Sequence, residues 1–436
     1  MALETDWSLA GIAARRDRYF SPGLQKFVPF AEPMIFQRGR GQYLWDQAGR
    51  QYTDLLGMNV CISVGHAHPD VVEAASAQAR DLPHCTTMFS HPVPAHYAEE
   101  LASTFPKGHE WVVHLTNSGS EAVDLALMMA RAFTGQTDFL SLHNAYHGPT
   151  AGAQALTGIS GFRQNVVQVP GISFVPEPNL YRGVFGADIG AYLDMIEQTI
   201  KVATSGRIAG MIAETIQGYT GVIEMPEGYL KGAAERVRAA GGLLVIDEVQ
   251  SGVGRTGEAF WAFEAHDVVP DIVVAAKGIG NGFPIGAVVA KREIAEAMAD
   301  KFMFHTYGSN PVSAAAAREV LRIIEADRLQ KNARVVGDLL LERLRDLQQR
   351  HKAIGDVRGK GLMLAIELVR DRASKEPDPD FTAAVFEQTR QHGIIVSKSG
   401  PHRSVLRLVP PLCLSADDVD QVADAFDACL SAAAGQ

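Results

Sequence analysis

The sequence predicts an α/β protein whose larger domain contains a mostly parallel sheet flanked by helices and is followed by a smaller α+β domain. Short apolar runs alternate with helical patterns from about Trp111 to Ala290, which is typical of βαβ units. The run at 243–246 is apolar at consecutive positions, as in a strand covered on both faces. After Pro311 the pattern changes to long amphipathic helices.

The strands predicted in the larger domain are short apolar runs bounded by polar or turn-forming residues. They cover residues 111–115, 139–142, 208–213, 243–246, 272–275 and 287–290. We expect the strand at 243–246 to lie in the centre of the sheet, because a half-exposed strand would alternate apolar and polar residues.

The C-terminal part of the chain predicts the smaller unit. Amphipathic helices are expected at 314–326 and 331–350, followed by an extended segment at 361–368. The polar stretch 371–380 predicts a surface loop, since Pro and Asp favour turns.

Composition and charge exclude several classes of protein. The 436 residues are 47% apolar and 21% charged, which is typical of a globular enzyme. Lys and Arg number 40 against 50 Asp and Glu and form no basic stripe, which argues against a nucleic-acid partner. The four cysteines form no CxxC pair, which argues against a disulfide framework and a zinc ribbon.

No targeting segment is expected. Residues 1–7 are acidic and lack the apolar core and cleavage site of a secretory signal. No stretch reaches the roughly 18 consecutive apolar residues of a membrane span. The sequence therefore predicts a cytoplasmic protein without a membrane partner.

A carboxylate follows the predicted central strand directly. Asp247 stands where the run 243–246 emerges, and open α/β sheets bind ligands at this edge. A carboxylate there can keep the nitrogen of a pyridine ring protonated, so that the ring withdraws electrons. The alternative is a helix cap or a loop salt bridge, which is the commoner role of a single aspartate.

A lysine follows the next predicted strand in the same way. Lys277 comes directly after the apolar segment 272–276 and precedes several glycines, which allow a tight turn. A lysine facing a cavity can form a Schiff base when desolvation and nearby positive charge lower its pKa. Most lysines are solvated surface groups, but the buried strand leading into Lys277 favours the functional interpretation.

A third motif joins a strand to a helix at 116–131. Its turn contains Ser118, Gly119 and Ser120, and free N–H groups at a helix N-terminus bind phosphate. The alternative is a capping box formed by Ser118 and Glu121, which needs no ligand.

Two further motifs suggest other ligands. Residues 252–257 match GxGxxG, but polar residues separate them from the preceding strand, so a dinucleotide site is not expected. His143 and His147 are four residues apart, but a metal site at this spacing requires a helix, and the strand here runs into Gly148 and Pro149. Tyr146 between them is better interpreted as a ring that stacks on an aromatic cofactor.

Together these motifs resemble the class III aminotransferases of fold type I. The resemblance extends from Gly65 to Leu412, and its most specific block is 246–257 followed by 276–278. The blocks 117–122 and 145–148 look most like the alanine–glyoxylate and β-aminoisobutyrate–pyruvate branch. The resemblance implies a seven-stranded sheet and a large domain at 76–325. Residues 1–75 and 326–436 would then form the small domain.

The resemblance also implies pyridoxal phosphate as the cofactor and no metal ion. Lys277 would form a Schiff base with it and move a proton between the substrate Cα and the cofactor C4′, and Asp247 would pair with the pyridine nitrogen. Val249 and Tyr146 would pack on the two ring faces, and Gln250 would reach the ring hydroxyl. The remaining cofactor residues implied are Ser118, Gly119, Ser120, His147, Glu214 and Thr306. Thr306 would act in the partner's site, which implies a homodimer or a dimer of dimers.

The substrate residues implied are Arg407, Tyr219 and Phe89. Arg407 matches the family arginine that binds a substrate carboxylate, a task that suits the planar guanidinium. Tyr219 stands where ornithine and 4-aminobutyrate enzymes carry a glutamate that masks this arginine. The departure weakens an assignment to ω-amino acids.

The predicted activity is transfer of an amino group from an amino acid or β-amino acid to pyruvate, glyoxylate or 2-oxoglutarate by a ping-pong mechanism. A lyase, racemase or mutase on the same fold is the first alternative. A non-catalytic binding protein is the second, but the combination of Lys277 and Asp247 argues against it.

Overall fold

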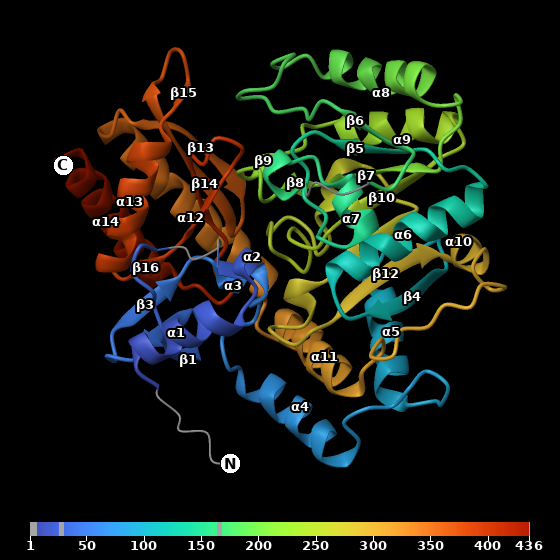
Figure 1. Ribbon diagram of the computed structural model, residues 1–436, viewed down its shortest axis with the longest axis horizontal. Coiled ribbons are helices and arrows are strands. Elements are labelled where there is room, and N and C mark those ends of the chain that lie inside the picture. The colour runs from blue at the N-terminus through green and yellow to red at the C-terminus, as the bar shows by residue number, and fades with distance from the viewer. Residues whose placement is uncertain (1–6, 26–29, 164–167, 436) are drawn as a thin grey trace.

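A seven-stranded sheet forms the centre of the larger lobe in the computed structural model, which describes residues 7–25, 30–163 and 168–435 (Figure 1). The strand order is β4-β12-β11-β10-β7-β5-β6. The strands are β4 (Trp111–Thr116), β5 (Phe139–Leu142), β6 (Ile172–Val175), β7 (Gly210–Glu214), β10 (Leu243–Asp247), β11 (Ile272–Ala275) and β12 (Gly286–Lys291). All pairs from β11 to β6 are parallel, whereas β12 is antiparallel to β11 and β4. The predicted α/β class is confirmed.

Each strand predicted in this lobe is present, with ends that differ by one or two residues. The sequence analysis does not predict β6, an edge strand whose run Ile-Ser-Phe-Val is short and interrupted by a polar residue. The direction of β12 follows from its connection to β11, because residues 276–285 are too few for the crossover that a parallel neighbour requires. Residues 1–6, part of the segment expected to lack a secretory signal, lie outside the described residues.

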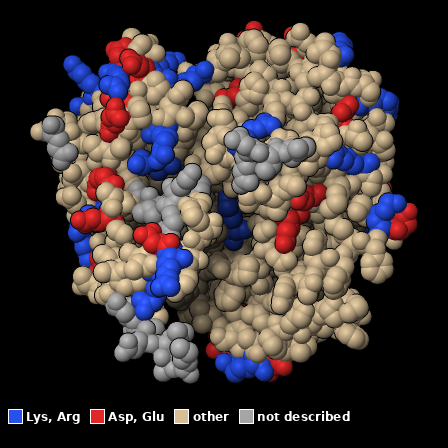
Figure 2. All heavy atoms as spheres, viewed as in Figure 1, with Lys and Arg blue, Asp and Glu red and all other residues tan. Residues whose placement is uncertain are grey.

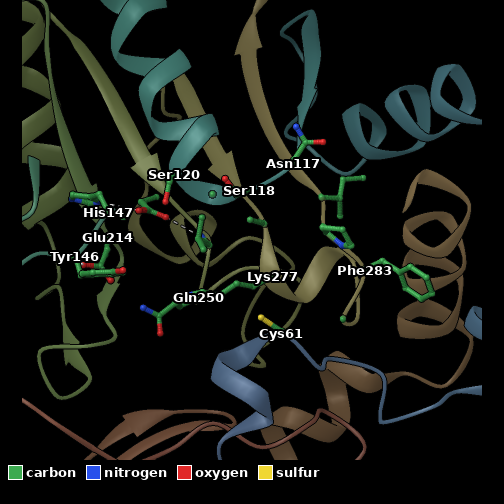
Figure 3. A pocket seen from close by; sticks show the side chains of 18 residues that line it. Cys61, Asn117, Ser118, Ser120, Tyr146, His147, Glu214, Gln250, Lys277 and Phe283 are labelled. Carbon is green, nitrogen blue, oxygen red and sulfur yellow. Dashed lines mark hydrogen bonds and ion pairs between the residues drawn. The ribbon is translucent and has the colours of Figure 1, made fainter. Parts of the chain in front are cut away.

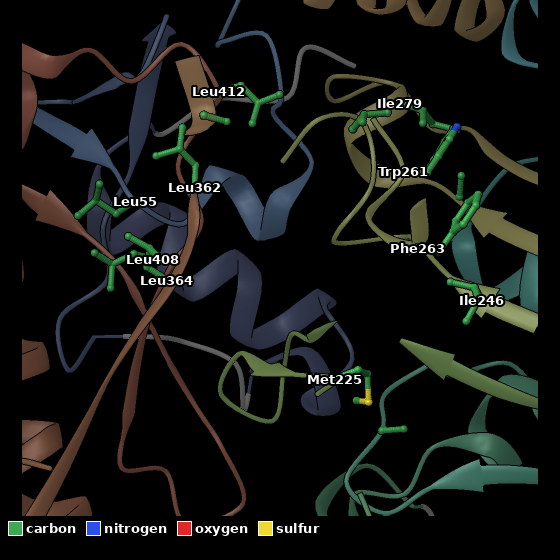
Figure 4. Packing of buried hydrophobic residues seen from close by; sticks show 14 of the residues in the cluster. Leu55, Met225, Ile246, Trp261, Phe263, Ile279, Leu362, Leu364, Leu408 and Leu412 are labelled. Atoms are coloured by element: carbon green, nitrogen blue, oxygen red, sulfur yellow. The ribbon is translucent and has the colours of Figure 1, made fainter. Parts of the chain in front are cut away.

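Side chains of the central strands pack into apolar clusters on both faces of the sheet. Val245 packs with residues of α6 (Gly119–Thr134). Leu244 and Ile246 belong to the cluster that contains residues of α8 (Ile189–Ala203) and α9 (Tyr229–Ala239). Figure 4 shows Ile246 close to Phe263 and Trp261 in this second cluster. Because both faces are covered, successive residues of β10 are all buried, as the sequence predicted.

Helices surround the sheet and lead to the smaller lobe. They are α4 (Pro69–Asp81), α5 (Pro92–Ser103), α7 (Ala151–Leu156), α8 (Ile189–Ala203), α9 (Tyr229–Ala239), α10 (Arg292–Glu296) and α11 (Pro311–Ala326). Short elements fill the loops: η1 (Ser160–Phe162), η2 (Ala262–His266), η3 (Lys277–Ile279), β8 (Ile216–Gln217) and β9 (Ile223–Glu224). The helix predicted at 314–326 begins three residues earlier, since Asn310 caps it and Pro311 suits its first position.

The smaller lobe contains a second sheet, covered by helices (Figure 1). Its elements are α12 (Leu329–Arg350), β13 (Ile354–Lys360), β14 (Met363–Asp371), β15 (Glu376–Pro377), α13 (Pro379–Gln391), β17 (Ser397–Ser399), β18 (Val405–Leu408) and α14 (Ala416–Ala434). The stretch 371–380, predicted as a loop only, also contains β15 and the start of α13, because Asp378 caps that helix.

The N-terminal strands pair with a strand from the C-terminal part of the chain. The elements are α1 (Leu9–Tyr19), α2 (Pro22–Gln25), β1 (Phe36–Arg40), β2 (Tyr43–Asp46), β3 (Gln51–Asp54), α3 (Gly57–Val60) and β16 (Ile394–Ile395). β16 continues the sheet β1-β2-β3 by parallel pairing with β3. This pairing joins the N-terminal strands to the C-terminal part of the chain.

Charged side chains of both signs are interspersed over the face shown in Figure 2, which is hollowed between the two lobes. Within the described part of the chain, no helix combines the length and the apolar character needed to cross a bilayer.

Candidate functional site

The carboxyl ends of β7, β10 and β11 meet at one edge of the sheet and border a cavity of about 330 Å³. In the strand register, Asp247 lies opposite Glu214 on one neighbouring strand and Val274 on the other. Every predicted cofactor residue except Thr306 lines this cavity: Ser118, Gly119, Ser120, Tyr146, His147, Glu214, Asp247, Val249, Gln250 and Lys277. Figure 3 shows these side chains converging from separate strands and loops.

The N-terminus of α6 forms one end of the cavity. Ser118 caps the helix, since its Oγ accepts a hydrogen bond of 3.2 Å from the Glu121 N–H. Glu121 accepts from the Asn117 N–H at 2.7 Å instead of returning to Ser118, so the predicted capping box is only half formed. A Cβ on Gly148 would lie 2.1 Å from Ser120 Oγ, so the chain can approach this end only as glycine. A helix N-terminus open to a cavity suits a phosphate group.

A carboxylate and a histidine lie deeper in the cavity. Asp247 Oδ2 is 2.7 Å from His147 Nδ1, and Asp247 Oδ1 accepts from the Val249 N–H at 3.0 Å. Both side chains are buried, and His147 Nε2 has no hydrogen-bond partner among the described residues. The pair fixes the orientation of the Asp247 carboxylate. A carboxylate held in this way suits the protonated nitrogen of a pyridine ring.

Glu214 is a second buried carboxylate beside this pair. It accepts hydrogen bonds from the backbone N–H groups of Tyr146, at 3.2 Å, and Gly218, at 3.0 Å. Burial raises the pKa of Glu214 to about 7, and the adjacent Asp247 adds to the effect while His147 opposes it. Burial therefore favours the protonated form of this carboxyl group.

Lys277 lies directly after β11 and borders the same cavity. Removal from water lowers the pKa of its ammonium group, and the nearby Arg407 lowers it further. Cys61, Asp247 and Glu214 act in the opposite direction. The net lowering favours the neutral amine, which is the form that reacts with a carbonyl group. A phosphate site, a pyridine-nitrogen site and an amine are thus present in one cavity, which fits pyridoxal phosphate.

Arg407 lies behind the cavity and not in its lining. It is buried on β18, donates from Nη1 to Gln250 Oε1 at 2.8 Å and from Nε to Ser397 Oγ at 3.3 Å. Within the described residues, no carboxylate lies within ion-pair distance of Arg407. Burial lowers the pKa of Arg407 to about 10. Gln250, predicted to reach the ring hydroxyl, therefore also connects the cavity to this arginine.

Two aromatic rings, those of Phe162 and Tyr219, pack against Tyr146. Phe162 lies with its ring centroid 4.8 Å from that of Tyr146 and 4.7 Å from that of Tyr219. Tyr219, predicted as a substrate residue, is therefore close to the cavity without lining it. Phe162 is not predicted by the sequence analysis, because a phenylalanine in a loop carries no distinguishing signal.

Thr306 and Phe89 are not brought to the cavity of their own chain. Thr306 is exposed, and the side chain of Phe89 is 70% exposed. Their two segments contact each other, since the rings of His84 and Tyr307 lie 5.1 Å apart.

The structure also locates the two competing motifs. Residues 252–256 form consecutive turns, and the short helix η2 begins only at Ala262, whereas a dinucleotide-binding loop leads directly into a helix. His147 turns towards Asp247, and the sequence analysis missed this contact because nothing in the local pattern relates two residues one hundred positions apart. Cys61 and the segment 282–285 also line the cavity and were not predicted.

Comparisons with known proteins agree with this geometry. The family model for aminotransferase class-III matches residues 28–430. The chain is 44% identical to alanine–glyoxylate aminotransferase 2 homolog 2, mitochondrial, of Arabidopsis thaliana, over 96% of the chain and 87% of that protein. It is 36% identical to the mitochondrial alanine–glyoxylate aminotransferase 2 of Homo sapiens, over 92% of the chain and 83% of that protein.

Solved structures give the same result. An (S)-enantioselective omega-transaminase from Thermomicrobium roseum superposes with a TM-score of 0.90 at 34% identity, covering 98% of this chain and 100% of that one. A PLP-bound amine transaminase from an uncultivated Pseudomonas species superposes with a TM-score of 0.87 at 33% identity, covering 92% and 95% of the two chains.

Proposed function

Because the chain belongs to the aminotransferase class-III family and is a PLP-dependent transaminase, we propose that it transfers an amino group from an amino acid to pyruvate, glyoxylate or 2-oxoglutarate. The observation that carries the proposal is the combination of Lys277, Asp247 and the N-terminus of α6 in one cavity, with the buried cation of Arg407 behind it. Two relatives are named alanine–glyoxylate aminotransferases, which favours alanine as donor and glyoxylate as acceptor.

Each residue has a distinct task in this proposal. Bound pyridoxal phosphate supplies a carbonyl group that condenses with amines and a ring that withdraws electrons from the substrate Cα. The backbone of Ser118, Gly119 and Ser120 binds the phosphate. Asp247, oriented by His147, keeps the pyridine nitrogen protonated. Val249 and Tyr146 confine the ring between them.

Lys277 and Arg407 act on the substrate. The amine of Lys277 holds the cofactor before substrate arrives and then moves a proton between Cα and C4′, which its lowered pKa favours. Arg407 binds the substrate carboxylate, because a buried guanidinium that has no carboxylate partner among the described residues is stabilised by an anionic ligand. Tyr219 and Phe162 then define the width of the space left for the substrate side chain.

We also propose that the protein is a homodimer in which Thr306 and Phe89 complete the cavity of the partner. Support comes from an exposed apolar surface formed by these two segments: Met88, Phe89, Phe302, Phe304 and Tyr307. Large exposed apolar patches mark sites of association. A cytoplasmic location remains our proposal from the sequence, although two relatives are named mitochondrial, and cell fractionation tests it.

The test is a screen of amino donors against the three oxo acids, in which both the oxo product and the new amino acid are identified. Transamination predicts equal amounts of the two products, and each half-reaction should proceed alone. Release of ammonia, inversion at Cα or migration of the amino group without a new amino acid would instead indicate a lyase, a racemase or a mutase.

A further inference from the structure

The backbone of Lys277 has a conformation that residues other than glycine rarely adopt. Its φ is 48°, in the left-handed region, directly after Ala276 in extended form. Crowding between Cβ and the backbone opposes this conformation in L-amino acids. Such residues persist only where surrounding contacts hold them in place. The turn itself provides two hydrogen bonds, from Ile279 N–H to Ala276 O at 3.2 Å and from Gly280 N–H to Lys277 O at 3.0 Å.

Two buried side chains connect the segment 278–281 to the segment 63–65. Ser63 Oγ donates to the carbonyl of Gly278, the residue after Lys277, at 2.6 Å. Asn281 Oδ1 accepts from the N–H groups of Ser63, at 2.9 Å, and Val64, at 3.0 Å. Asn281 Nδ2 completes the set by donating to Gly65 O at 2.9 Å. We call Ser63 and Asn281 the clasp.

Ser63 is anchored independently of the Lys277 turn. Asp54 accepts from the Leu56 and Gly57 N–H groups, each at 2.9 Å, and pairs with His66 at 2.7 Å, which closes the segment 54–66 on itself. The carbonyl of Ser63 accepts from the N–H of Leu412 at 2.7 Å. Figure 3 shows Cys61 of this segment directly beside Lys277. Ser63 therefore has a position set by the N-terminal and C-terminal parts of the chain.

We propose that Ser63 and Asn281 are positioning residues, which hold the left-handed turn at Lys277 and thereby direct its amine into the cavity. The inference rests on the proposed role of Lys277. Because the Gly278 carbonyl belongs to the next residue, its bond to Ser63 determines the direction in which the chain leaves Lys277, and so the direction of the side chain. Neither clasp residue lines the cavity, although Cys61 and Gly282, one or two residues away from them in the chain, do. The proposed effect on Lys277 passes through the hydrogen bond from Ser63 to the Gly278 carbonyl.

The test compares Ser63→Ala with Ser141→Ala as a matched control. Both serines are fully buried, and Ser141 Oγ also donates to a backbone carbonyl, that of Leu156, at 2.6 Å. Apoprotein is mixed with pyridoxal phosphate, and the rate at which a borohydride-reducible visible absorbance forms is followed, together with the pH midpoint of that absorbance. Ser63→Ala should slow capture about tenfold or more, because small misplacement of a reacting group has effects of this size. Ser63→Ala should also shift the pH midpoint of the visible absorbance.

Ser141→Ala should leave the rate and the midpoint unchanged, even if both variants lower the melting temperature equally. Asn281→Ala should behave like Ser63→Ala, which gives a second variant if one of them does not fold. The proposal is refuted if Ser63→Ala and Asn281→Ala capture pyridoxal phosphate at the same rate, and with the same pH midpoint, as Ser141→Ala. Lys277→Ala separates the two proposals. If this variant retains the reducible absorbance, the role of Lys277 itself is refuted. If it loses the absorbance while Ser63→Ala and Asn281→Ala behave like the parent protein, only the positioning role of Ser63 and Asn281 is refuted.

Discussion

Asp247 is the last residue of β10 and His147 lies in the segment after β5, and their side chains meet in the cavity at 2.7 Å. The contact uses His147 Nδ1 and leaves Nε2 buried without a partner among the described residues. Asp247 thus faces a hydrogen-bond donor on one side and the cavity on the other. At the level of single residues, this arrangement explains how a carboxylate can be both buried and oriented towards a ligand.

Replacing Asp247 with asparagine should separate cofactor binding from catalysis. We expect Asp247→Asn to bind pyridoxal phosphate through the unchanged α6 end of the cavity. Removal of the Cα proton should slow about a hundredfold or more, the size of effect seen when an electrostatic stabiliser is lost. Stopped-flow measurement of the half-reaction with an amino donor checks this. A half-reaction rate near that of the parent protein would exclude the proposed role.

Replacing Arg407 tests the substrate class. Arg407→Ala should leave the affinity for pyridoxal phosphate intact and weaken carboxylate substrates by roughly 2–4 kcal/mol, because the substrate anion loses its buried partner. The same variant should bind an amine without a carboxylate almost as well as the parent does. The measurement is the apparent affinity for a matched pair of donors with and without the carboxylate. Equal losses for both would mean that Arg407 supports the fold or the cofactor.

At the level of elements, the loops after the parallel strands hold the site, and buried polar groups fasten these loops. Glu248, the residue after β10, accepts hydrogen bonds from Phe263 N–H at 2.8 Å and Ala262 N–H at 3.2 Å, at the start of η2. Ser251 Oγ donates to the same carboxyl group at 2.8 Å, and Thr215 Oγ1 donates to Ser251 Oγ at 2.7 Å. Thr215, the residue after β7, is thus connected through Ser251 to the Glu248 carboxyl group.

Glu248 should make stability depend on pH. Burial raises its pKa from 4.5 to about 7, so the folded protein binds this proton more tightly than the unfolded chain. The resulting stabilisation is complete below about pH 4.5 and is lost as the pH rises to about 7. The loss is roughly 3 kcal/mol at most. Thermal unfolding of Glu248→Gln should therefore show a smaller fall in melting temperature between pH 5 and pH 8 than the parent protein.

Glu264→Gln is the control for this measurement, since Glu264 lies on the same η2 turn but is exposed. It should retain the pH dependence of the parent. The pKa of Glu214 is also raised, and Glu214 remains in both variants. Part of the pH dependence of the melting temperature should therefore persist. An unchanged dependence in Glu248→Gln would show that this carboxyl group stays charged in the folded protein.

At the level of the whole molecule, the exposed segments around Phe89 and Thr306 give a test of the shared cavity. Lys277→Ala and Thr306→Arg should each be inactive alone. In a mixed dimer, one cavity carries both substitutions and the other carries neither. Random exchange should therefore restore about a quarter of the parental activity, because half of the dimers are mixed. Activity is measured after subunit exchange verified by differently tagged chains. Absence of recovery would count against a cavity completed by the partner.

Local patterns in the sequence were sufficient to predict most strands of the larger lobe and two residues of the site. The consecutive apolar residues of β10 indicated burial on both faces. A charged residue at the end of an apolar run marked Asp247, the last residue of β10, and Lys277, two residues after β11. These features are local, because burial and turn chemistry depend on neighbours along the chain. The edge strand β6 was missed since a short, half-buried strand has no such pattern.

Only the tertiary structure decided which distant residues meet. The contacts of His147 with Asp247, Gln250 with Arg407 and Ser63 with Gly278 each join segments of the chain at least one hundred residues apart. No periodicity relates such positions, because strand order and packing bring them together. The sequence by itself thus determined the strands, the turn residues and the chemical groups available. The fold determined which of these groups touch, and so the orientation of the carboxylate, the partner of the arginine and the direction of the lysine.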